Sequence, residues 1–159
     1  MKKLIILFLM LISLTLTGCK SKEKVPLEDV YGKYVYKECL YVNSNNTFTK
    51  ESLNNLYKNK ARYSLKETSF TFYESESTTP TLSIKNIEYV EVEITEEVND
   101  SVAKKIIKKA STRYDVYRSG DSQGYSFIFN EEEVYFLEFR YMSNKEHVVW
   151  HIFLLEKRD

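Results

Sequence analysis

Two histidines near the end of the chain have the spacing of a metal site. His147 and His151 are four residues apart, which on a helix would place both side chains on one face. The apolar, β-branched segment around them predicts a strand instead. Four strand residues span about 13 Å, whereas zinc lies about 2 Å from each histidine nitrogen. We therefore expect no shared metal ion and no other cofactor.

Cys39 is the second residue whose side chain could do chemistry. A catalytic thiol needs an electropositive, partly exposed site that lowers its pKa, and the sequence shows no sign of one. Free cysteines are commonly buried, so we expect an inert side chain in the core. A Cys–His or Ser–His–Asp site stays open as an alternative, because such residues meet in space and not in sequence.

Other catalytic patterns are missing from the chain. Glu131, Glu132 and Glu133 lack the ligand spacing of a calcium loop and indicate a solvated hairpin tip. The chain has only four glycines, from which no phosphate-binding loop or dinucleotide fingerprint can be written. We therefore expect a protein that is not an enzyme.

The first eighteen residues have the three parts of a secretory signal peptide. Lys2 and Lys3 precede a thirteen-residue hydrophobic run from Leu4 to Leu16. The apolar region of such leaders is typically about 7–15 residues long, whereas a membrane-spanning helix needs about 20. We expect residues 1–18 to direct export and to be removed.

Cys19 follows this leader within a specific motif. Leu16-Thr17-Gly18-Cys19 resembles the bacterial lipobox, in which a branched apolar residue, a small residue and Gly or Ala precede an acceptor cysteine. The resemblance implies that Cys19 carries a diacylglyceryl thioether and becomes the mature N-terminus. Two acyl chains anchor a protein stably, at about 0.8 kcal/mol per buried methylene. We expect a lipid-anchored protein that faces away from the cytoplasm, on either a plasma membrane or an outer membrane.

The rest of the chain predicts a single folded domain. We expect residues 19–26 to form the lipidated N-terminus and a solvated tether, and residues 27–159 to form the domain, which fits the usual domain size. The full sequence balances 23 basic against 23 acidic residues. It shows no basic stripe of the kind that a nucleic-acid binder carries, so we expect no nucleic-acid partner.

Period-two alternation of apolar and polar residues predicts eight or nine short strands. The expected strands lie, in chain order, within residues 31–42, 61–74 (a hairpin), 81–94 (two strands or one bent strand), 113–118, 125–129, 134–141 and 147–156. Two segments have helical spacing: residues 48–61, with Thr49 as the N-cap, and residues 98–110, with Asn99 or Asp100 as the N-cap. The second helix carries an apolar stripe of Val102, Ile106 and Ala110.

These elements predict a mainly β fold with two short helices, arranged as an antiparallel barrel or half-open barrel. Gly32-x-Tyr34 at the start of the first strand, the helix that follows and the terminal strand around Trp150 are similar to small lipocalin-like bacterial lipoproteins. Lipocalins have tryptophan where this chain has Tyr34. An α+β sandwich is the competing interpretation.

The predicted strand at 134–141 supplies our candidate ligand-lining residues. They alternate along one face, which we expect to point inward: Tyr135, Leu137, Phe139 and Tyr141. Barrels of about eight strands can hold one small ligand. We expect a binding module for a small apolar or amphipathic ligand. The alternative is a protein-binding inhibitor, immunity or envelope-assembly factor that uses the tyrosines, thirteen in all, as contact residues.

Overall fold

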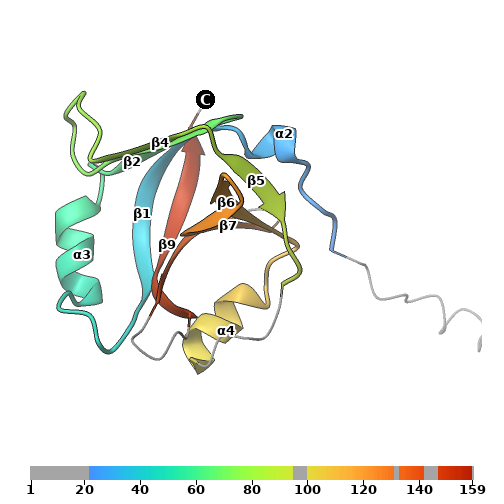
Figure 1. Ribbon diagram of the computed structural model, residues 1–159. Coiled ribbons are helices and arrows are strands. Elements are labelled where there is room, and N and C mark those ends of the chain that lie inside the picture. Colours follow the sequence, from blue (N-terminus) through green and yellow to red (C-terminus); the bar gives the residue numbers. More distant parts are fainter. Residues whose placement is uncertain (1–21, 95–99, 131–132, 142–146, 159) are drawn as a thin grey trace, which may run out of the picture.

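The fold is one curled antiparallel sheet with short helices beside it (Figure 1). The computed structural model describes residues 22–94, 100–130, 133–141 and 147–158. Its nine strands follow the order β4-β3-β2-β1-β9-β8-β7-β6-β5, and every pair of neighbours is antiparallel. The predicted fold class, a mainly β half-open barrel, is confirmed.

The elements lie close to the predicted segments. The strands are β1 (Gly32–Val42), β2 (Arg62–Lys66), β3 (Ser69–Tyr73), β4 (Leu82–Lys85), β5 (Glu88–Glu91), β6 (Thr112–Arg118), β7 (Asp121–Phe129), β8 (Val134–Tyr141) and β9 (His147–Arg158). The helices are α2 (Leu27–Val30), α3 (Lys50–Tyr57) and α4 (Ser101–Ile107). None of these helices has the length and apolar character that a membrane span requires.

Side-chain caps begin the two predicted helices. Thr49 and Ser52 form a capping box at α3, in which each side chain accepts from the other residue's backbone N–H. Asp100 accepts from the backbone N–H groups of Val102 and Ala103 at the start of α4. The four-residue helix α2 was not predicted.

The sheet curls so far that its two edge strands meet at one corner. β4 and β5 are consecutive in the chain, although they end the sheet on opposite sides. Ile87, which lies between them, donates its backbone N–H to the carbonyl of Thr68 just before β3 at 3.2 Å, and the hydroxyl of Tyr89 in β5 donates to the carbonyl of Ser69 in β3 at 3.1 Å. The chain itself therefore bridges the gap at this corner.

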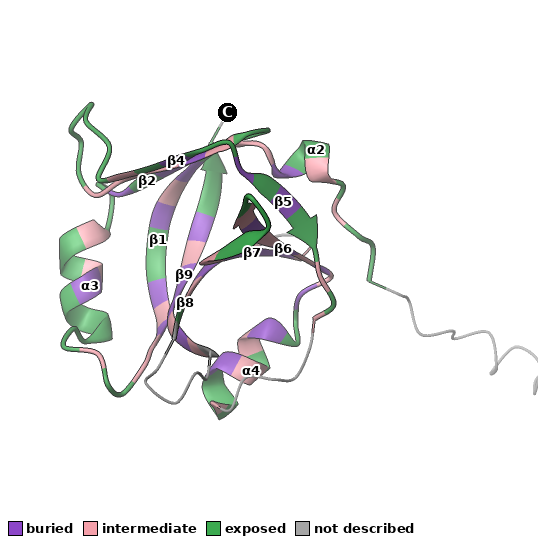
Figure 2. Ribbon diagram, viewed as in Figure 1, coloured by how far each residue is buried: buried purple, intermediate pink, exposed green. Residues whose placement is uncertain are grey.

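The inner face of the curled sheet is packed with aromatic rings. Phe70 of β3 and Phe136 of β8 lie 5.8 Å apart between ring centroids, although three strands separate β3 from β8 in the sheet order. Only the concave face can bring them together. Along β1, buried and exposed positions alternate (Figure 2), and Tyr34 and Tyr36 belong to this concave core.

Strands β7 to β9 bury their outer face as well, beneath α4. This second cluster contains Tyr41, Ala103, Ile107, Ala110, Ile128, Tyr135, Leu137, Val149 and Ile152. The predicted apolar stripe is confirmed at Ala110, which is buried, and at Ile106, which packs against this cluster, but not at Val102, which is 47% exposed; Ala103 and Ile107 are buried instead. One residue corresponds to about 100° of helix rotation, so the line of contact is shifted from Val102 toward Ala103 and Ile107.

The described part of the predicted tether is bound to the domain and is not free in solvent. Lys22 Nζ donates to the carbonyls of Lys108 and Ala110, at 2.6 and 3.0 Å. The backbone of Val25 donates to Thr112 Oγ1 at 2.8 Å and accepts from the Tyr114 hydroxyl at 2.8 Å. Residues 22–25 thus follow the end of α4 and the start of β6.

Candidate functional site

An aromatic pocket of about 210 Å³ opens into the concave side of the half-barrel. Seven of its ten lining residues are aromatic. The ten residues together come from α3 and six strands. The lining residues are Tyr57, Tyr63, Phe70, Phe72, Leu82, Tyr125, Phe136, Glu138, His151 and Phe153. We call this site the aromatic pocket.

Ring-to-ring contacts fix the walls of the aromatic pocket. Phe136 lies 5.1 Å from Tyr63 and 5.7 Å from Tyr125 between ring centroids. Tyr57, at the end of α3, meets Phe72 edge-on at 5.9 Å. Such offset and edge-to-face pairs are favourable beyond their buried area, so the walls are preorganised.

Tyr63, one of the residues that line the pocket, has an unusual hydroxyl group. The Tyr63 side chain is 2% exposed, and among the described residues its hydroxyl has no hydrogen-bond partner. Burial, followed by the nearby Tyr57, raises the pKa of Tyr63 well above its ordinary value, so the group stays neutral. A buried hydroxyl without a partner costs free energy, and a ligand in the pocket could supply the missing partner.

Glu138 and His151, which also line the pocket, form a hydrogen-bonded pair. His151 Nδ1 lies 3.1 Å from Glu138 Oε2, and Arg140 Nε donates to Glu138 Oε1 at 2.9 Å. Burial would raise the pKa of the Glu138 carboxyl, but the hydrogen bonds from His151 and Arg140 outweigh it and lower the pKa below its ordinary value. The pocket therefore contains a carboxylate that is ionised at neutral pH.

The predicted ligand-lining residues lie on the other face of β8. Tyr135, Leu137 and Phe139 pack in the cluster beneath α4, whereas β8 contributes Phe136 and Glu138 to the aromatic pocket. The side chain of Tyr141 lies outside the described residues. Both faces of β8 are buried, and the prediction considered only one of them. The large apolar Phe136 on the opposite face was the signal that the prediction overlooked.

The other candidate residues do not join the pocket. Cys39 is buried, its thiol donates to the carbonyl of Tyr41 at 3.4 Å, and burial raises its pKa to about 12. His147 begins β9, but its side chain is not among those described, and Cys19 and the lipobox also lie outside the described ranges. Within those ranges, no three His, Cys, Asp or Glu side chains gather as a metal site would require.

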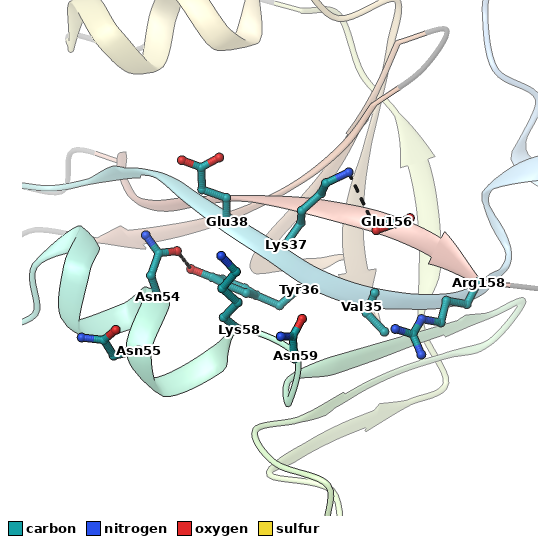
Figure 3. A pocket seen from close by; sticks show the side chains of 10 residues that line it. All are labelled: Val35, Tyr36, Lys37, Glu38, Asn54, Asn55, Lys58, Asn59, Glu156 and Arg158. Atoms are coloured by element: carbon teal, nitrogen blue, oxygen red, sulfur yellow. Dashed lines mark hydrogen bonds and ion pairs between the residues drawn. The ribbon is translucent and has the colours of Figure 1, made fainter.

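A second, polar groove runs between α3 and the edge of β1 (Figure 3). It has a volume of about 560 Å³ and is lined by Val35, Tyr36, Lys37, Glu38, Asn54, Asn55, Lys58, Asn59, Glu156 and Arg158. Lys37 of β1 and Glu156 of the neighbouring strand β9 form an exposed ion pair at 3.8 Å. Asn54 Oδ1 accepts from the Tyr36 hydroxyl at 2.7 Å and from the backbone of Cys39 at 2.9 Å. This amide holds α3 against β1, so its role is structural.

Comparison of the chain with protein-family models, curated proteins and solved structures found no match. Function is therefore inferred from the leader and from the aromatic pocket themselves.

Proposed function

We propose that the protein is an exported lipoprotein, anchored to a membrane through Cys19, whose half-barrel binds one small ligand with an apolar body. The aromatic pocket carries this proposal. Small-molecule sites are concave and mostly apolar, with a few placed polar groups that orient the ligand. Here the polar groups are the Tyr63 hydroxyl and the Glu138–His151 pair.

The size of the pocket limits the ligand to a compact molecule. An engineered apolar cavity of about 150 Å³ binds benzene, and the aromatic pocket is somewhat larger, at about 210 Å³. It therefore suits a single substituted ring or a branched group of similar bulk. A long acyl chain would extend beyond it.

The bound N-terminal segment suggests how the domain stands on the membrane. Three chain steps separate Cys19 from Lys22, which limits their Cα atoms to about 11 Å. Since Lys22 is fixed to the end of α4, a lipid on Cys19 would hold that side of the domain near the bilayer. The N-terminal segment and α3 lie on opposite sides of the sheet in Figure 1. The Tyr57 wall of the pocket would then face away from the membrane.

Replacement of the acceptor cysteine tests the anchor. We expect the wild-type chain to partition into the membrane fraction and to incorporate a labelled fatty acid, and Cys19→Ser to lose both properties. Cys39→Ser is the matched control and should keep both. Unchanged processing and membrane partitioning of Cys19→Ser would refute the anchor.

Mass spectrometry of the folded protein tests the binding role. Protein purified from its own membranes should release a stoichiometric small molecule when it is denatured. A stoichiometric protein partner in the same fractions, with no small molecule retained, would instead support the inhibitor or assembly role.

A further inference from the structure

We propose that the aromatic pocket selects a protonated amine with a compact apolar body, in preference to a neutral or anionic molecule of the same shape. This inference rests on the proposed function and names its ligand class. Three features of the pocket support it independently.

The first feature is the ring surface. The faces of tyrosine and phenylalanine rings carry negative electrostatic potential, and they attract organic cations within about 6 Å of the ring centroid. Seven rings line the pocket, from Tyr57 on α3 to Phe153 on β9. An ammonium group that entered would therefore meet ring surfaces on several sides.

The second feature is the free hydroxyl of Tyr63. A protonated amine carries N–H donors and no acceptor, and a tyrosine hydroxyl oxygen can accept a hydrogen bond. Because Tyr63 is buried and its hydroxyl has no partner among the described residues, a donor on the ligand would satisfy it.

The third feature is the charge of Glu138. Its negative charge reaches three tyrosines of the pocket. After burial, it is the next cause of the raised pKa of Tyr125, and it contributes to the raised pKa of Tyr57 after burial and Glu74, and of Tyr63 after burial, Tyr57 and Tyr36. The compensating cation, Arg140, donates to Glu138 at 2.9 Å and also lies over the Trp150 ring at 4.7 Å. Arg140 is 54% exposed and Glu138 only 21%.

Exposure decides which of these two charges dominates inside the pocket. Solvent-exposed charges are strongly screened by salt and water, whereas partly buried charges are screened less. At Tyr125, where both charges act on the pKa of the phenol, the Glu138 carboxylate raises that pKa more than Arg140 lowers it. An anionic ligand would therefore meet both the Glu138 carboxylate and the negative ring faces.

Three probes that share a phenylethyl body test this selectivity at neutral pH: 2-phenylethylamine, 2-phenylethanol and 3-phenylpropanoate. We expect the amine to bind at least about tenfold more tightly than the carboxylate, a difference of about 1.4 kcal/mol, with the alcohol between them. Nuclear magnetic resonance titration of the folded domain measures all three affinities under one set of conditions.

Two variants assign the preference to its residues. Glu138→Gln keeps the side-chain size but removes the charge, and should reduce the amine-to-alcohol affinity ratio without abolishing the part that the ring faces supply. Tyr63→Phe removes the hydroxyl and should weaken the amine and the alcohol while leaving toluene binding unchanged. Glu156→Gln, on the exposed ion pair of the polar groove, is the charge-matched control and should change none of the affinities.

Equal or tighter binding of the carboxylate would overturn the amine preference. So would an amine-to-alcohol ratio that Glu138→Gln leaves unchanged. In either case the pocket would still bind a small molecule, and the proposed function would stand. If neither the three probes nor toluene binds the wild-type chain, the proposed function itself fails.

Discussion

Asn46 Nδ2 lies 2.5 Å from His151 Nε2, which joins the loop after β1 to the wall of the aromatic pocket. The side-chain oxygen of Asn46, Oδ1, accepts from the backbone N–H of Phe48 at 2.9 Å. The side-chain N–H₂ group of Asn46 therefore faces the imidazole. Nε2 must then accept, and the ring proton resides on Nδ1, where it is donated to Glu138. The loop and the carboxylate together fix the orientation of the His151 ring.

Removal of the Asn46 side chain should loosen this loop. Asn46→Ala takes away the Phe48 backbone acceptor and the His151 partner, and we expect it to lower the free energy of unfolding by about 1–2 kcal/mol. Urea unfolding measures the loss, and amide exchange should rise in residues 43–49. Asn45→Ala is the matched control, because the Asn45 side chain is exposed and makes no described contact. Equal stability of the two variants would contradict the assigned contacts.

The low pKa of Glu138 predicts a specific acid sensitivity. A carboxyl whose pKa is lower in the folded state than in the unfolded state stabilises the fold above its unfolded pKa. That contribution is lost as the pH falls from about 4.5 through the folded pKa. Glu138→Gln should therefore be less stable than wild type at pH 6, and the gap should narrow at pH 3. Thermal melting at each pH measures the gap. If the melting temperatures of the two proteins differ by the same amount at every pH in this range, the ion-paired role of Glu138 is contradicted.

Asn54 should stabilise the packing of α3 on β1. Its side-chain oxygen is the acceptor for two groups, the Tyr36 hydroxyl and the Cys39 backbone N–H, and both residues are about 1% exposed. Asn54→Ala leaves both donors without this partner, and we expect it to lower the free energy of unfolding by about 2–4 kcal/mol. The neighbouring Asn55 is exposed, so Asn55→Ala should change stability by less than about 0.5 kcal/mol. Similar losses in both variants would show that Asn54 has no such role.

Cys39 should not react while the protein is folded. The thiolate is the reactive form of cysteine, and burial raises the pKa of Cys39 to about 12. Iodoacetamide at pH 8 should therefore modify Cys39 only after denaturation, as measured by intact-mass analysis of a Cys19→Ser chain. Rapid modification of the native chain would reopen the Cys–His alternative.

Local patterns predicted the elements well, because strand alternation and helix caps depend on neighbouring residues. Thr49 and Asp100 begin helices where the sequence indicated. The binding of residues 22–25 to β6 was not predictable in this way. It depends on Thr112 and Tyr114, which lie almost ninety positions later in the chain.

The pocket was harder to predict than the sheet, because seven elements contribute to it. Alternation along β8 separated Tyr135 and Leu137 from Phe136 and Glu138 correctly. It did not show which face is concave, because α4 covers the first pair and the curl of the sheet encloses the second. That choice depends on the direction of curling, which no single strand encodes.

The central claim is that the aromatic pocket admits a small apolar molecule, and toluene binding tests it most directly. Leu82 lines the pocket, whereas its neighbour Ser83 is exposed, and successive strand residues point to opposite faces. We predict saturable shifts of the Tyr63 and Phe136 ring signals in the wild-type chain and in Ser83→Trp, and none in Leu82→Trp, where the indole would fill the space. Absence of saturable shifts in the wild-type chain, or unchanged shifts in Leu82→Trp, would contradict the claim.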